Sequence, residues 1–152
     1  EGYCTAMIMA ATGLQRLGYE DKITEILDPL IMFPAVSQGA IAIEIREDDN
    51  AMASMIEAIN HYQTFTTVKA ERTFLRSLEG GCQTPIGCFS EISNEKFRLT
   101  GIVLNLDGSG IIKESKVGKL IDAENTALIL ARSLIKKGAG EMIQKIRTLN
   151  NI

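Results

Sequence analysis

The sequence predicts an α+β fold: a complete C-terminal domain with a three-stranded antiparallel sheet and helices on one face, preceded by incomplete α/β pieces. Three observations lead to this prediction. Three β-forming segments follow one another between residues 88 and 114, and two amphipathic segments then close the chain. The first third alternates strand-like and helix-like patterns without enough strands to close a sheet.

The first third begins with a continuous apolar run over residues 4–10, typical of a strand buried on both faces. A helix is expected over 11–17, ending at Gly18, followed by a short strand over 23–27 that Pro29 terminates. Pro34 and the turn formers Ser37-Gln38-Gly39 then interrupt regular structure. We expect a crossing between domains at this point.

The middle of the chain repeats the strand-then-helix pattern. Residues 40–45 (AIAIEI) are strongly β-forming, and Asp48 or Asp49 can cap a helix that runs through Ile59. A second amphipathic helix is expected over 64–78, with Gly80-Gly81 as its C-terminal stop.

The C-terminal part predicts strands over 88–92, 97–106 and 111–114. Asp107-Gly108 is a strong hairpin signal between the last two strands, so antiparallel pairing follows. Helices over 122–136 and 139–149 complete this domain.

Composition excludes several functional classes. The net charge is −3 and the basic residues are scattered, which argues against nucleic-acid binding. The apolar runs are far shorter than the ~20 residues of a membrane span, so no membrane segment is expected. Cys4, Cys82 and Cys88 lack CxxC spacing and His61 stands alone, so we expect no metal site and reduced thiols in a cytoplasmic protein. The start at Glu1, without methionine, suggests the interior of a longer polypeptide.

The most unusual local feature is the segment LEGGCQTPIG, residues 78–87, in which two glycines precede Cys82. Glycines let a large group approach the backbone, and a thiol in a loop can act as a nucleophile. A buried cysteine after a glycine-capped helix fits the same residues. Local chemistry alone leaves both interpretations open. Cys4, Cys88 and His61 are best interpreted as structural residues.

This segment resembles the part of the porphobilinogen deaminase family that bears the cofactor cysteine. Residues 10–18 (AATGLQRLG) and 33–40 (FPAVSQGA) are similar to two further family stretches, the second being its hinge. Short matches at 60–62 and 70–72 follow in the same order. The resemblance runs from Tyr3 to the last helix and is weaker after Asn94.

The resemblance implies a transferase of porphyrin and heme biosynthesis. Such an enzyme condenses porphobilinogen head to tail into the linear tetrapyrrole hydroxymethylbilane and releases ammonia at each addition. Its cofactor, a dipyrromethane, would be joined to Cys82 by a thioether. Arg16 would bind acetate and propionate groups, for which a guanidinium is well suited. The remaining cofactor-binding residues implied are Gln38, Gly39, Gly80 and Gly81.

The resemblance also implies how the chain is divided. Residues 1–33 would end domain 2, residues 34–60 would form the hinge and a returning segment of domain 1, and residues 61–152 would be the C-terminal domain. The first two pieces would belong to periplasmic-binding-protein-like domains. Ser37 replaces the glycine expected in the hinge, which makes a positive φ less comfortable there.

The family's catalytic aspartate lies in its N-terminal half, so no catalytic residue is assignable here. We therefore expect this chain to be inactive without that half, and the full-length enzyme to be monomeric. A different class of function also fits the residues: a stand-alone small α+β binding or regulatory domain in which Cys82 is merely an accessible thiol.

Overall fold

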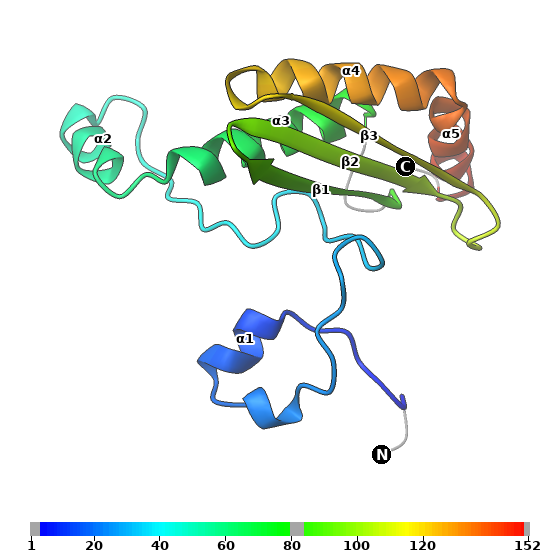
Figure 1. Cartoon of the computed structure of the whole chain (residues 1–152), viewed down its shortest axis with the longest axis horizontal. Coiled ribbons are helices and arrows are strands. Elements are labelled where there is room, and N and C mark those ends of the chain that lie inside the picture. Colours follow the sequence, from blue (N-terminus) through cyan, green and yellow to red (C-terminus); the bar gives the residue numbers. More distant parts are fainter. Residues whose placement is uncertain (1–3, 80–83, 151–152) are drawn as a thin grey trace. The chain divides into compact units, whose positions relative to one another are not determined.

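The computed structural model describes residues 4–79 and 84–150 (Figure 1). The chain divides into two compact units, Glu1–Met32 and Phe33–Ile152. The elements of the smaller unit are α1 (Ala11–Arg16) and the short 3-10 helix η1 (Glu20–Lys22). Those of the larger unit are α2 (Asn50–Glu57), α3 (Tyr62–Ser77), β1 (Ile86–Ser93), β2 (Lys96–Leu104), β3 (Ile111–Lys119), η2 (Leu120–Asp122), α4 (Ala123–Lys136) and α5 (Ala139–Asn150).

The sheet of the larger unit is antiparallel, with the strand order β1-β2-β3. The turn between β2 and β3 follows from its sequence: Gly108 adopts a φ of 72°, and the Asp107 carboxylate accepts hydrogen bonds from the Ser109 amide and hydroxyl. The predicted antiparallel sheet, with its Asp-Gly hairpin, is confirmed.

The core lies on one face of this sheet. Phe97, Leu99 and Val103 of β2 are fully buried and alternate along the strand. Phe74 of α3 lies against Gly101, and Thr126 of α4 lies against Gly118, a residue paired with Phe97 in the register. Helices α3 and α4 therefore cover the same face, as Figure 1 shows.

Side-chain caps fix where two helices begin. The Asp49 carboxylate accepts a hydrogen bond from the Met52 amide at 3.0 Å, which confirms the predicted cap of α2. His61 caps α3, accepting from the Thr64 amide through Nδ1. The structural role expected for His61 is thus confirmed.

The predicted stop of α3 at Gly80-Gly81 needs correction. The helix ends at Ser77, and the residue with positive φ is Glu79, at 52°. A left-handed residue after the helix satisfies its last carbonyls, a position that glycine usually occupies. Gly80 and Gly81 themselves lie outside the described residues.

The predicted strands at 4–10, 23–27 and 40–45 are wrong, since none of these segments forms a strand in the structure. A strand is held by hydrogen bonds to a neighbouring strand, and no described segment pairs with them. Their apolar side chains are consequently exposed: Met7 to 71% and Ile41 to 79%. Cys4, expected in a core, is exposed as well.

Within the ranges that the structure describes, no helix is both long and apolar enough to cross a membrane.

Candidate functional site

The segment that begins at Phe33 lies across the sheet face opposite the helices. A Cβ on Gly87 would come within 2.7 Å of Phe33 Cβ and 3.2 Å of an Ile102 methyl group. Lys113 Nζ lies 4.7 Å from the centre of the Phe33 ring. Gly87, Ile102 and Lys113 are register neighbours across the three strands. Phe33 therefore packs against these three neighbouring residues, and the absence of a side chain at Gly87 leaves the space that it occupies.

Three and four residues later the chain contacts the helix-covered face. Val36 packs against the hydrophobic core, and the Ser37 amide donates a hydrogen bond of 2.8 Å to Glu71 Oε2 on α3. The Ser90 hydroxyl of β1 donates to the other carboxylate oxygen, Oε1, at 2.6 Å. Because β1 is an edge strand, residues 33–37 pass around this edge from one face to the other.

Residues 35–38 form a tight turn, which we call the hinge turn. The Gln38 amide donates to the Ala35 carbonyl at 3.0 Å, and Ser37 has a φ of 65°. A glycine is favoured at such a position, so Ser37 accepts a strained backbone. Its hydroxyl oxygen is also buried and has no hydrogen-bond partner among the described residues.

Gln38 and Gly39, both predicted to contact a cofactor, follow directly from this turn. Both are exposed, and Gly39 has a φ of 88°. They belong to the larger unit, whereas Arg16 belongs to the smaller one, where it ends α1 and is exposed. Arg16 forms no ion pair with any described residue.

Glu71 is the buried charge of this region. It is only 8% exposed, and burial raises its pKa, although the hydrogen bonds from Ser90 and Ser37 act in the opposite direction. Sequence reasoning missed this residue. Its neighbour Arg72 is exposed and forms no ion pair with any described residue. The available signal was helical spacing, because Glu71 shares a face with Phe74 and Leu78.

Cys88 is a core residue, as predicted. It is fully buried, and burial together with the nearby Glu71 carboxylate raises the pKa of its thiol. Thiolates rather than thiols are nucleophilic, so this cysteine is chemically inert at neutral pH.

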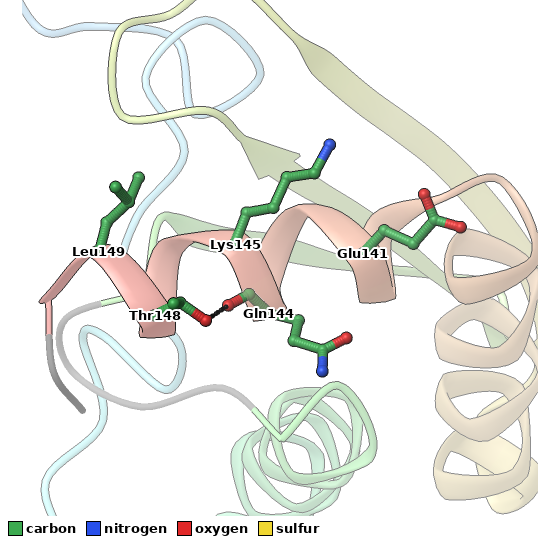
Figure 2. A pocket seen from close by; sticks show the side chains of 5 residues that line it. All are labelled: Glu141, Gln144, Lys145, Thr148 and Leu149. Atoms are coloured by element: carbon green, nitrogen blue, oxygen red, sulfur yellow. Dashed lines mark hydrogen bonds between the residues drawn. The ribbon is translucent and has the colours of Figure 1, made fainter.

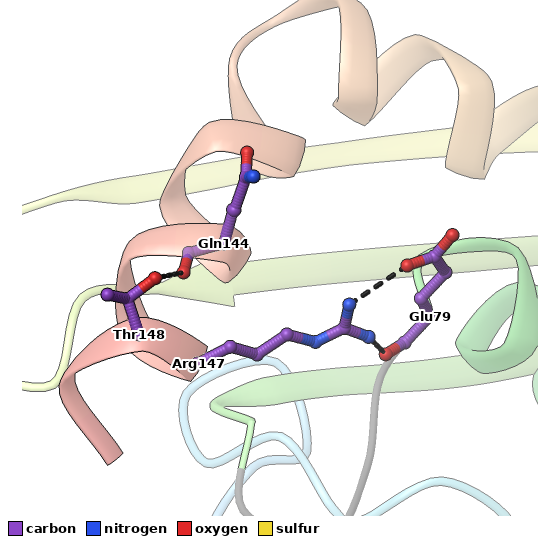
Figure 3. A network of polar contacts seen from close by, with 4 residues as sticks. All are labelled: Glu79, Gln144, Arg147 and Thr148. Atoms are coloured by element: carbon purple, nitrogen blue, oxygen red, sulfur yellow. Dashed lines mark hydrogen bonds and ion pairs between the residues drawn. The ribbon is translucent and has the colours of Figure 1, made fainter. Parts of the chain in front are cut away.

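Cys82, the predicted attachment point, lies outside the described residues, as do Gly80 and Gly81. The residue before them, Glu79, is held by Arg147 of α5 (Figure 3). Arg147 Nη1 lies 2.9 Å from Glu79 Oε2, and Nη2 donates to the Glu79 carbonyl. This two-point contact supports the positive φ of Glu79 at the position where the chain enters the Cys82 segment.

Two hollows lie on the surface of the larger unit near α5. One, of about 390 Å³, is bounded by the end of α3, by α4 and by α5, and is lined by Ser77, Leu78, Glu79, Ile135, Gly140, Ile143, Gln144 and Arg147. The other, of about 630 Å³, is lined by Glu141, Gln144, Lys145, Thr148 and Leu149 (Figure 2). All residues of the second come from α5, and a single helix cannot enclose a ligand. The first is therefore the better candidate for a site, because it borders the residue preceding the Cys82 segment.

Two family models match the chain. Residues 1–54 match "Porphobilinogen deaminase, dipyromethane cofactor binding domain", and residues 65–136 match "Porphobilinogen deaminase, C-terminal domain". The first match includes Arg16, Gln38 and Gly39, and the second includes Glu71 and Cys82.

Curated relatives agree with these matches. The chain is 45% identical over 141 residues to the porphobilinogen deaminase of Carboxydothermus hydrogenoformans. The matched residues make up 93% of the chain and 45% of the relative. It is 48% identical over 140 residues to that of Bacillus cereus, covering 91% of the chain and 45% of the relative. It is 44% identical over 145 residues to the porphobilinogen deaminase of Nostoc sp., covering 95% of the chain and 45% of the relative. The chain thus spans less than half the length of these relatives.

Proposed function

This chain belongs to the porphobilinogen deaminase family, and we propose that it forms part of a transferase that condenses porphobilinogen into hydroxymethylbilane with release of ammonia. The primer is a dipyrromethane joined to Cys82 by a thioether. The family match over residues 1–54 to a dipyrromethane cofactor-binding domain supports this cofactor.

The observation that carries the choice of Cys82 is the environment of the other thiols. Cys88 is fully buried and its pKa is raised, so it cannot present a thiolate to a pyrrole. Cys4 is exposed but follows no pair of glycines. Cys82 follows Gly80 and Gly81, which leave room for a large group to approach the backbone, and it lies in the segment that resembles the family's cofactor-bearing segment.

Arg16, Gln38 and Gly39 are the proposed cofactor contacts outside the Cys82 segment. Dipyrromethane carries acetate and propionate groups, and an exposed guanidinium can bind a carboxylate through two parallel hydrogen bonds. The exposed Arg16 side chain is suited to that role. Gln38 and Gly39 offer an amide side chain and unhindered backbone groups.

We further propose that catalysis needs a companion N-terminal half that supplies the catalytic aspartate, giving a monomeric enzyme when both halves are joined. Under this proposal residues 1–33 and 34–60 belong to two periplasmic-binding-protein-like domains, and residues 61–152 form the C-terminal domain. The exposed apolar side chains of Met7 and Ile41 support it, because the missing half would cover them. The chain alone is then inactive.

A fusion tests this proposal. The N-terminal part of the Bacillus cereus relative, which this chain does not span, is joined to residue 1, and hydroxymethylbilane formation from porphobilinogen is measured. We expect turnover by the fusion, none by the 152-residue chain, and none by the fusion carrying Cys82→Ser. The matched control, Cys4→Ser, removes an exposed thiol and retains activity.

Two outcomes would contradict the proposal. Turnover by the chain alone would show that no companion is needed. A folded fusion without turnover, with an unmodified Cys82, would favour the alternative function: a small α+β binding or regulatory domain with an accessible thiol.

A further inference from the structure

We propose that Glu71 is a positioning residue that fastens the hinge turn to the α+β domain, so that Gln38 and Gly39 keep a fixed place relative to the domain that carries Cys82. The consequence for the cofactor depends on the proposed function, because only that function gives Gln38 and Gly39 a ligand. The fastening itself depends on the contacts of Glu71 alone.

Glu71 joins three separate parts of the larger unit through one carboxylate. The side chain comes from α3, Oε2 accepts from the Ser37 amide at 2.8 Å, and Oε1 accepts from the Ser90 hydroxyl of β1 at 2.6 Å. Both oxygens are occupied, and hydrogen bonds to a carboxylate are stronger than those between neutral groups. The side chain is largely removed from water, which strengthens these contacts further.

The backbone of Ser37 shows why such a contact is needed. A non-glycine residue with a φ of 65° is held in a sparsely populated conformation, and it persists only where its surroundings impose it. The bond to Glu71 acts on the amide of this same residue. Removing the acceptor leaves the turn without its main external restraint.

Phe33 provides the second anchor of the segment. It packs over Gly87 on the opposite face of the sheet, so residues 33–37 are held on both sides of the edge strand β1. The limit between the two compact units accordingly falls before Phe33, and not after Gly39. The hinge turn therefore belongs structurally to the α+β domain.

Amide hydrogen exchange, followed residue by residue by NMR on the 152-residue chain, tests the fastening. Glu71→Met places an apolar side chain of similar volume in the buried site but removes the carboxylate oxygens that accept the hydrogen bonds. We expect at least tenfold faster exchange at the Ser37 amide, with Leu99 and Val103 of β2 changed less than threefold. Glu71→Gln retains an acceptor oxygen and should stay within threefold of the wild type at Ser37.

Glu91→Met serves as the matched control. Glu91 lies on β1 next to Ser90, and among the described residues its ion-pair partner is Arg98, at 3.9 Å, so its replacement should leave the Ser37 amide unchanged. Unchanged exchange of Ser37 in Glu71→Met would overturn the proposal, as would an equal acceleration at Leu99, which would indicate general loosening. If Glu71→Met does not fold, Glu71→Ala is measured in its place, and unchanged Ser37 exchange in that variant overturns the proposal. None of these rates requires dipyrromethane, so the fastening and the proposed function can fail independently.

Discussion

Phe74 of α3 lies so close to Gly101 of β2 that a Cβ at residue 101 would come within 2.8 Å of its Cε2 atom. Phe74 is fully buried, and a ring in a packed core has no room to retreat. We therefore expect Gly101→Ala to lower the free energy of unfolding by about 1–3 kcal/mol in urea titrations followed by circular dichroism. Gly140→Ala is the control. Gly140 lies in α5, and a Cβ there would meet the Ile135 side chain at an ordinary 3.6 Å, so this change should be neutral or stabilising.

Stability should fall with rising pH because of Glu71. Burial raises its pKa above the ordinary 4.5, so just above pH 4.5 the folded state retains a proton that the unfolded state has lost. The free energy of unfolding therefore decreases as the pH rises through this window and is level above the raised pKa. The groups that face the carboxylate are Ser37, Ser90 and Cys88. Urea titrations from pH 4.5 upward to pH 8 should show this slope in the wild type and a smaller one in Glu71→Gln; the same slope in both would contradict the assignment.

Glu114 should have the opposite effect at lower pH. Lys116, Ser133 and Lys137 hold its pKa down to about 2, and the two lysine nitrogens lie 2.7 and 3.1 Å from its oxygens. The unfolded state takes up a proton near pH 4.5 and the folded state does so only near 2, so stability is lost as the pH falls between these values. Because the lysines are partly exposed, we expect about 1–2 kcal/mol rather than the full amount that the pKa shift implies.

The variant Glu114→Gln should abolish this acid sensitivity in unfolding measurements between pH 4.5 and 2.5. Glu91→Gln provides the comparison, since its partner Arg98 is 3.9 Å away and both side chains are about half exposed. An acid-induced loss that is as large in Glu114→Gln as in the wild type would refute the role of this cluster.

Ser37→Gly should stabilise the larger unit. Glycine adopts a φ of 65° without strain, and the change also removes a buried hydroxyl that lacks a partner in the described part of the chain. The greater freedom of glycine in the unfolded chain offsets part of this gain, so we expect a net increase of about 1 kcal/mol in the free energy of unfolding. Ser37→Ala removes the hydroxyl but keeps the Cβ and should give a smaller increase. A Ser37→Gly variant less stable than the wild type would show that the turn is not strained.

The C-terminal sheet and its helices could be predicted because their signals are local. The Asp107-Gly108 turn and the periodic apolar residues of α4 determine their own conformations. The last strand runs to Lys119, beyond the predicted end at 114. Residues 115–119 (SKVGK) contain two lysines and a glycine, which is a weak strand pattern, so the sequence did not indicate this extension. Its hydrogen-bonded pairing with β2 stabilises the strand conformation of these residues, although their intrinsic β-propensity is low.

The failures share a physical cause: they depend on contacts between residues distant in sequence. Residues 4–10 and 40–45 are β-forming, yet a strand exists only with a neighbour to pair with. Glu71 is a charged residue on an amphipathic helix, which is ordinary in a sequence, and its role depends on Ser37, which lies 34 residues earlier. The strain at Ser37 was foreseeable, whereas the acceptor that supports it was not.

The mass of the peptide that contains Cys82 shows whether this thiol carries the cofactor. Trypsin should release residues 77–96 of the fusion after incubation with porphobilinogen, and this peptide carries both Cys82 and Cys88, so fragmentation must locate any added mass. We expect two linked pyrroles on Cys82 and an unmodified Cys88. An active fusion in which Cys82 is unmodified, or in which Cys4 or Cys88 carries the adduct, would contradict it.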